Sequence, residues 1–104
     1  MGTLREKQSK FVVMTAKLIS FADSNGYELS YGDAYRDDRC DYGHSTSLHR
    51  KRLAVDFNLF RDGKFLRTTE DHKPLGMFWE SIGGSWGGRF GDGNHYSLEH
   101  RGMK

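Results

Sequence analysis

The sequence predicts an α+β domain in which a small, mostly antiparallel sheet carries helices on one side. Apolar residues recur at helical spacing near the N-terminus, alternate with polar residues over 53–60, and return to helical spacing after residue 74. The chain has 104 residues, which leaves room for one modest core. We therefore expect a single domain spanning residues 1–104.

The first expected element is a helix that begins near Thr3. Thr3 and Glu6 have the spacing of a capping box, in which each residue satisfies a free backbone N–H of the other. The sequence SNG at 24–26 ends the helix, with Gly26 as a left-handed cap. The apolar residues that share one face of this helix are Leu4, Phe11, Met14, Leu18 and Ala22.

Strands are expected next. YELSY at 27–31 alternates as a short strand, and the polar, Gly-punctuated segment 32–46 predicts a long loop. RLAVDFNLF at 52–60 alternates again, and RDGK at 61–64 has the chemistry of a hairpin turn leading into a paired strand, KFLRTT. The two faces of the longer strand are Leu53, Val55, Phe57 and Leu59 toward the core, and Ala54, Asp56, Asn58 and Phe60 away from it.

A second helix is expected with its start near Pro74. Gly83 and Gly84 end it, and a Gly-rich loop then leads into a short strand from about His95 to Glu99. Its buried stripe comprises Leu75, Phe78, Trp79 and Ile82.

Composition limits the classes of function. The formal charge of +2 is mild and the acidic residues are interleaved, which argues against a nucleic-acid partner but is compatible with an anionic bacterial wall. A single cysteine, Cys40, excludes an internal disulfide. We find no apolar run for a membrane span and no secretory signal, so we expect the product to start in the cytoplasm.

Two pairs of residues have spacings that suit a metal site. His49 precedes the long strand from which Asp56 projects, and Asp92 lies three residues before His95. If the two strands are neighbours, His49, Asp56 and His95 converge. Two imidazoles and one carboxylate leave the fourth position on Zn²⁺ open, as a catalytic zinc site requires.

Other interpretations stay open at this point. His49 could be a partly exposed polar residue, Asp56 could pair with Arg50 or Arg52, and DGNH at 92–95 could be a simple turn. A rival, structural metal site could use Cys40, His44 and His49, although these spacings match no common zinc module.

Two motifs carry a family resemblance. SLHRKRLAVD at 47–56 resembles the Ser-x-His-(x)4-Ala-x-Asp motif of the D-Ala-D-Ala carboxypeptidase/VanY superfamily, and DGNH resembles its later Asp-x-x-His. The text that joins them, including AVDFNLFRDGKF and WGGRFGDGNHYSLEH, is similar to phage and prophage endolysins of the L-alanyl-D-glutamate peptidase type. The likeness covers roughly residues 27 to 100, and two motifs in the right order are far more specific than either alone.

The resemblance implies roles for the motif residues. His49, Asp56 and His95 would be the ligands of one Zn²⁺, and Asp92 would be the general base and acid. The zinc site would lie on the open face of the sheet, as in hedgehog-type and D,D-peptidase domains, and 1–104 would be a single peptidase domain.

Substrate-binding residues follow from the same resemblance. DAYR at 33–36 resembles the upstream Tyr-Arg motif, which points to Arg36 for substrate binding and oxyanion stabilisation, although Arg39 is close by. Ser47 matches the motif serine, which lies near the substrate. We expect Trp86 to pack against the site loop, and a stacking role on substrate is the alternative.

The chain departs from the family pattern in two places. Many relatives have Gly three residues after the first motif histidine, where this chain has Arg52, and this could alter the rim of the cleft. After the second motif histidine many have an aromatic residue and then an acid or Gln, where this chain has HYSLEH; the role of Glu99 therefore stays open.

The implied function is that of a zinc metallopeptidase, a hydrolase that degrades the peptidoglycan of the cell wall. The expected substrate is the stem peptide, most specifically its L-Ala–D-Glu bond, and we expect a monomer. Such a bacteriophage lysin would wait in the host bacterial cytoplasm until it reaches the wall or periplasm, where it causes host cell lysis.

Three alternatives remain. One is a D,D-carboxypeptidase acting on D-Ala-D-Ala termini. Another is a catalytically inactive zinc-containing module that binds the wall, which the presence of Asp92 and an upstream arginine disfavours. The last is a small basic nucleic-acid binder, for which the chain shows no aromatic-basic stripe.

Overall fold

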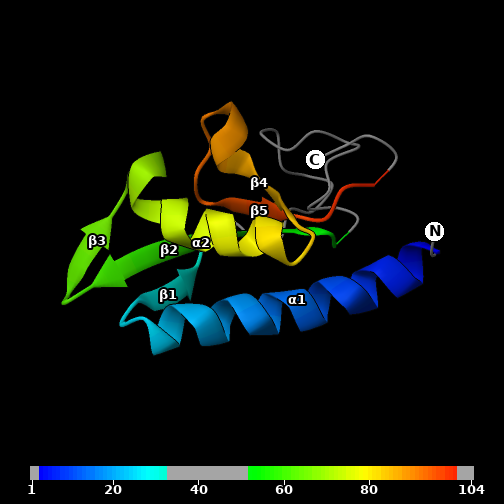
Figure 1. The fold of residues 1–104 in the computed structure, drawn as a ribbon, viewed down its shortest axis with the longest axis horizontal. Coiled ribbons are helices and arrows are strands. Elements are labelled where there is room, and N and C mark those ends of the chain that lie inside the picture. The colour runs from blue at the N-terminus through cyan, green and yellow to red at the C-terminus, as the bar shows by residue number, and fades with distance from the viewer. Residues whose placement is uncertain (1–2, 33–51, 101–104) are drawn as a thin grey trace, which may run out of the picture.

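The protein has the predicted α+β fold with an antiparallel sheet, and the described residues contribute five strands to it (Figure 1). The computed structural model describes residues 3–32 and 52–100. The strands are ordered β1-β2-β5-β4, and β3 pairs with β2. In chain order the elements are α1 (Leu4–Ser24), β1 (Glu28–Tyr31), β2 (Ala54–Arg61), β3 (Lys64–Leu66), α2 (Thr69–Ser81), β4 (Ser85–Trp86), the 3-10 helix η1 (Gly87–Phe90) and β5 (His95–Ser97).

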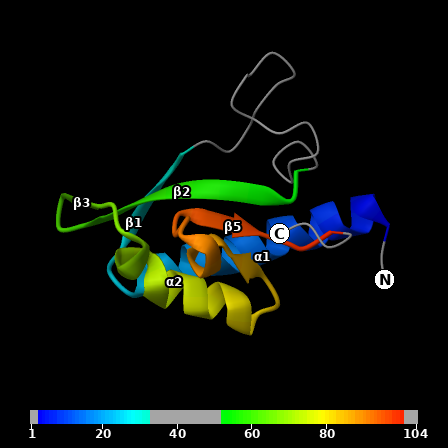
Figure 2. The same cartoon turned by 90° about the horizontal axis from the view of Figure 1, so that it is seen from above.

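Both helices lie on the same side of the sheet, and the core fills the space between them (Figure 2). Leu18 of α1, Trp79 of α2 and Tyr96 of β5 have no exposed surface, and Phe57 of β2 is 2% exposed. The predicted inward residues of the long strand are all buried. The alternation therefore identified the core residues of β2 correctly, although Ala54 and Asp56, predicted to point away from the core, are also buried at 4% and 7% exposed.

Helix α1 begins as predicted. The N–H of Glu6 donates to Oγ1 of Thr3 at 3.2 Å, and the N–H of Thr3 donates to Oε1 of Glu6 at 2.9 Å, which completes the capping box. Gly26 follows the helix with a φ of 82°, as expected of a left-handed cap. The prediction for Leu4 is wrong: this side chain is 36% exposed, because the first turn projects past the sheet (Figure 1).

Helix α2 begins earlier than predicted. Its N-cap is Thr68, whose Oγ1 accepts the N–H of Asp71 at 3.0 Å, and Asp71 accepts the N–H of Thr68 in return. Pro74 lies inside the helix, in its second turn, where the lost N–H costs one helical hydrogen bond. The reciprocal cap, which has Asp in place of Glu, supplies the true start. The predicted stripe packs inward, with Leu75 and Trp79 buried.

The sequence also predicts the hairpin between β2 and β3. Asp62 and Gly63 have φ values of 52° and 78°, and Arg61 pairs with Lys64, which is the geometry of a two-residue type I′ turn. The Gly-rich loop expected after α2 contains instead the short strand β4 and the 3-10 helix η1. Strand β5 starts at His95 as expected and ends at Ser97.

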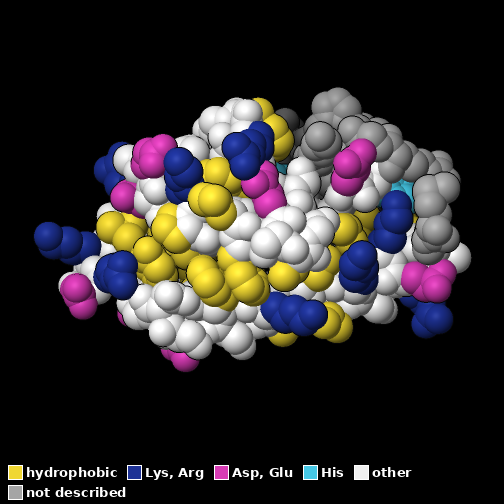
Figure 3. All heavy atoms as spheres, in the orientation of Figure 1, with side chains coloured by type: hydrophobic (Ala, Val, Ile, Leu, Met, Phe, Trp, Pro, Cys, Tyr) yellow, Lys and Arg dark blue, Asp and Glu magenta, His cyan; other side chains and the backbone are white. Residues whose placement is uncertain are grey.

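Apolar side chains gather on the helical face where α1 and α2 meet (Figure 3). The rings of Phe21 and Phe78 stack there with centroids 4.3 Å apart. In the described part of the chain, neither helix has both the length and the apolar character that crossing a membrane requires.

Candidate metal centre and active site

Asp56 and His95 lie directly opposite one another on β2 and β5. The bonds Leu98 N–H to Leu53 O (2.9 Å) and Phe57 N–H to Asn94 O (3.0 Å) flank this pair. Asp56 and His95 therefore occupy a non-hydrogen-bonded position of the antiparallel ladder, where facing side chains approach most closely. Strand pairing alone thus brings these two predicted ligands together.

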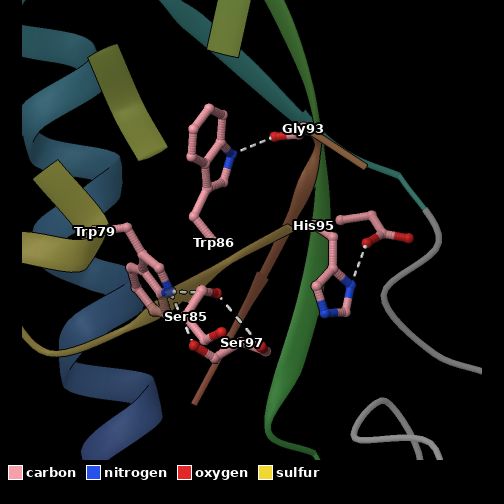
Figure 4. A network of polar contacts seen from close by, with 7 residues as sticks. Trp79, Ser85, Trp86, Gly93, His95 and Ser97 are labelled. Carbon is pink, nitrogen blue, oxygen red and sulfur yellow. Dashed lines mark hydrogen bonds and ion pairs between the residues drawn. The ribbon is translucent and has the colours of Figure 1, made fainter. Parts of the chain in front are cut away.

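The two side chains touch on the face of the sheet opposite the helices. Nδ1 of His95 lies 3.3 Å from Oδ1 of Asp56, and His95 points away from Trp79 and Trp86 (Figure 4). Asp56 is 7% exposed and His95 is 8% exposed. A carboxylate buried to this degree is costly unless a polar group faces it. His95 is one group that does so.

The chemistry of this pair fits zinc, which takes carboxylate oxygen and imidazole nitrogen as ligands. The third predicted ligand, His49, lies outside the described residues, as do Cys40 and His44 of the rival set. Within 3–32 and 52–100, no cluster of three or more His, Cys, Asp or Glu side chains is placed to hold a metal ion. The described part of the site is therefore a pair of donors.

Asp92 lies in the turn that leads into β5, which we call the site loop (residues 91–94). Its N–H donates to the carbonyl of Gly87 at 2.9 Å, and its carbonyl accepts the N–H of His95 at 3.1 Å. The DGNH segment is thus a turn, and its backbone bonds fix Asp92 relative to His95. The carboxylate of Asp92 itself is exposed to solvent.

Two close contacts hold the site loop in place. A side chain at Gly87 would overlap the carbonyl of Asp92 and come within 2.7 Å of Cβ of His95. Trp86 donates its indole N–H to the carbonyl of Gly93 at 2.7 Å (Figure 4). The loop is therefore held both by η1 and by a buried indole.

Trp86 is 5% exposed, and its ring packs where Gly76 of α2 leaves room for it. This burial favours the packing interpretation over the alternative of stacking on a substrate. The aromatic side chain beside the site is Phe90, which is 56% exposed with its ring centroid 6.1 Å from that of His95. Sequence reasoning missed Phe90 because no pattern placed η1 next to β5.

On the other face of the sheet from Asp56 and His95, a buried polar contact joins β5 to α2. The hydroxyl of Tyr96 lies 2.8 Å from Nδ1 of His72. Burial raises the pKa of Tyr96 far above its usual range, and burial lowers the pKa of His72, an effect that Asp71 partly opposes. A neutral phenol therefore faces an imidazole whose neutral form is favoured.

The remaining predicted site residues divide into two groups. Arg36, Arg39 and Ser47 lie outside the described residues. Glu99 is exposed just beyond β5, and its role stays open. Arg52 has a φ of 58°, which is the left-handed region that glycine favours.

Comparisons with known proteins bear on this site. A family model described as D-alanyl-D-alanine carboxypeptidase matches residues 41–98, which include both sequence motifs. No curated protein matches the chain. Because the matched segment covers more than half of the chain and contains both Asp56 and His95, the protein belongs to the D-alanyl-D-alanine carboxypeptidase family, whose peptidases act on peptidoglycan.

Proposed function

We propose that this protein is a zinc-dependent endolysin that hydrolyses the L-Ala–D-Glu bond of the peptidoglycan stem peptide. One observation carries the proposal: Asp56 and His95 face each other across β2 and β5, inside the segment that matches the peptidase family. His49 precedes Asp56 by seven residues, and Asp92 precedes His95 by three. The pair thus has a third candidate ligand and a candidate base close by in the sequence.

In this proposal His49, Asp56 and His95 hold the ion. A bound zinc ion supplies Lewis acidity toward the scissile carbonyl and the attacking water. Side chains of the protein transfer the proton and stabilise the developing charge. The carboxylate of Asp92 takes the proton of the attacking water and delivers it to the leaving amine. Arg36 faces the charge that develops on the carbonyl oxygen.

The choice of bond rests on the resemblance over residues 27 to 100. A second candidate is a D,D-carboxypeptidase, which the description of the matched family favours. Mass spectrometry of muropeptides released from purified walls separates the two activities. New L-Ala C-termini would identify the endopeptidase, and loss of a single terminal D-Ala would identify the carboxypeptidase.

The proposed setting is the wall of a bacterial host at the end of a phage cycle, with the enzyme reaching the wall from the host cytoplasm. Added from outside, the purified protein should clear bacteria whose outer membrane has been stripped and leave intact cells turbid. Clearing of intact cells at the same rate would contradict this setting.

Asp92→Asn tests the role of the base. The variant should retain one zinc ion per chain and lose wall-clearing activity by roughly a hundredfold or more, because general acid–base catalysis contributes about that much. Zinc content by plasma mass spectrometry and the turbidity of stripped cells are the two measurements. Glu99→Gln is the matched control, because it neutralises an exposed acid of the same segment.

The outcomes separate the proposals. Asp92→Asn with wild-type activity would refute the assignment of the base. Zinc binding without any hydrolysis by the wild-type protein would favour a wall-binding module. Zinc retained in Asp56→Asn or His49→Ala would refute the ligand set.

A further inference from the structure

Strands β3 and β5 share one edge of β2 and leave a gap between them. Strand β5 pairs with Ala54–Asp56, whereas β3 pairs with Leu59–Arg61. Phe57 and Asn58 lie between the two pairings. Along β2, the gap therefore begins one residue after Asp56.

This gap is a pocket of about 200 Å³, which we call the slot. It is lined by Phe57 and Asn58 of β2 and by the site loop, which includes Asp92. The rest of the lining comes from the end of β3 with Arg67, and from Thr69 and His72 of α2. At about 30 Å³ for a water molecule in the liquid, the slot holds roughly seven waters, which is room for one amino-acid residue.

One of the residues that line the slot, Arg67, carries a positive charge. Arg67 is exposed, and among the described residues it has no hydrogen bond or ion pair. His72 also lines the slot, but its lowered pKa keeps it neutral. Asp92, which also lines the slot, carries a negative charge, so a ligand with an amine near Asp92 and a carboxylate near Arg67 would match both charges.

The chemistry of the proposed reaction gives the slot its occupant. Asp92 must reach the leaving amine to protonate it. The substrate residue that carries this amine therefore lies on the side of the Asp56–His95 pair where Asp92 is. Among the described residues, the slot is a pocket that Asp92 lines. Both candidate bonds, L-Ala–D-Glu and D-Ala–D-Ala, place an α-carboxylate on the residue that leaves as the amine.

We propose that the slot is the subsite for the amine-side residue of the substrate, and that Arg67 binds the α-carboxylate of that residue. This proposal rests on the proposed peptidase function. It makes Arg67 a specificity-determining residue, because a guanidinium pairs with a carboxylate far better than with its neutral amide.

The test uses the zinc-loaded protein and two matched pairs of synthetic stem peptides. One pair contains the L-Ala–D-Glu bond with the α-carboxyl of Glu free or amidated. The other ends in D-Ala–D-Ala with its terminal carboxyl free or amidated. In whichever pair is cleaved, the wild type should show a KM for the carboxylate roughly tenfold or more below that for the amide, with similar kcat.

Arg67→Ala should raise the KM for the carboxylate peptide to that of the amide and leave the amide kinetics unchanged. Arg67→Lys should keep part of the discrimination. Lys64→Ala is the matched control, because Lys64 is an exposed cation of the same hairpin that does not line the slot. It should leave both KM values unchanged.

The failures are distinguishable. If the wild type cleaves neither pair, the peptidase function falls and the subsite falls with it. Equal KM values for carboxylate and amide in a cleaving wild type would overturn the subsite alone. A fall in kcat on both peptides of a pair in Arg67→Ala, with a shifted pH profile, would mean that Arg67 acts through Asp92 and would also overturn it.

Discussion

Arg52 holds its backbone in the left-handed region, with a φ of 58°, at the position where many proteins of the resembled family have glycine. A side chain with a Cβ pays roughly 1–2 kcal/mol in this conformation. Arg52 thus differs from the family pattern in sequence and also strains the backbone at this position. Its position just before β2 places the strain next to the strand that carries Asp56.

Arg52→Gly should therefore raise the free energy of unfolding by about 1 kcal/mol, less the entropy that glycine adds to the unfolded chain. Urea denaturation followed by circular dichroism measures the change. Arg52→Ala is the control, because alanine removes the long side chain but keeps the strained Cβ. An equal gain in both variants would show that the guanidinium, not the backbone, is responsible.

His72 is buried as the neutral imidazole, and burial lowers its pKa below the ordinary value of 6.5. Below that pH the unfolded chain binds a proton that the folded chain does not. The free energy of unfolding should therefore fall as pH drops from about 7 toward 5. Asp71 on the same helix opposes this shift of the pKa, and Tyr96 faces the imidazole from β5. The other charged residues near His72 are Arg67 and Asp92, which line the slot with it.

Urea titrations at several pH values, with a chelator present, test this expectation. In His72→Asn the side-chain amide can form a hydrogen bond with the Tyr96 hydroxyl in place of Nδ1, and position 72 no longer titrates. The variant should show a shallower loss of stability toward pH 5 than the wild type. Identical slopes would mean that His72 does not cause the acid sensitivity.

At the scale of elements, the site loop depends on how closely η1 approaches it. Gly87→Ala places a methyl group against the carbonyl of Asp92 and against Cβ of His95. Since the first of these contacts is with backbone, the loop must move. We expect zinc affinity to fall roughly tenfold or more, as when groups that orient metal ligands are altered.

Competition with a chromogenic chelator measures that affinity. Arg89→Ala is the control from the same 3-10 helix, because it removes an exposed ion pair with Glu80 and a distant contact with the Trp86 ring, and adds no atom against the site loop. Its effect should be small. Unchanged zinc affinity in Gly87→Ala would show that the clamp on the loop does not position His95.

Element by element, the sequence determines what lies within one strand or helix better than what lies between them. Alternation assigned Asp56 to the face away from the core, since it has a period of two within a single strand. The pairing of β2 with β5 was a condition of the predicted site and not itself a prediction. Strands that lie about forty residues apart in the sequence leave no local pattern that identifies them as partners. The sequence could not predict the slot for the same reason, because the slot arises where β3 and β5 pair with different parts of one edge of β2.

Local features of the sequence explain the errors in the predicted elements. Pro74 suggested a helix start, but the reciprocal cap of Thr68 and Asp71 begins α2 earlier. Strand β4 spans only Ser85–Trp86 among glycines, too short for alternation to be read. Leu4 matched the apolar spacing of α1 but lies beyond the packed part of that helix.

At the scale of the whole molecule, the core and the Asp56–His95 pair lie on opposite faces of the sheet. The core joins α1, α2 and the inward face of β2 and β5, and it uses neither Asp56 nor His95. The fold should therefore survive removal of the metal. Zinc should add stability by mass action, about 2.7 kcal/mol when free zinc is a hundredfold above its Kd.

Thermal unfolding with chelator and with zinc measures that increment. The chelated protein should keep its far-ultraviolet circular dichroism and melt cooperatively at a lower Tm. Asp56→Asn should show the lower Tm under both conditions. A chelated wild type that is unfolded would show instead that the metal organises the core.

The register between β2 and β5 also limits which insertions and deletions this family member can accept. Removing one residue from the site loop would slide β5 along β2 and turn its side chains to the opposite faces. Tyr96 would then point toward the metal site, and the imidazole of His95 would enter the core. The length of the site loop is therefore constrained more strictly than its composition.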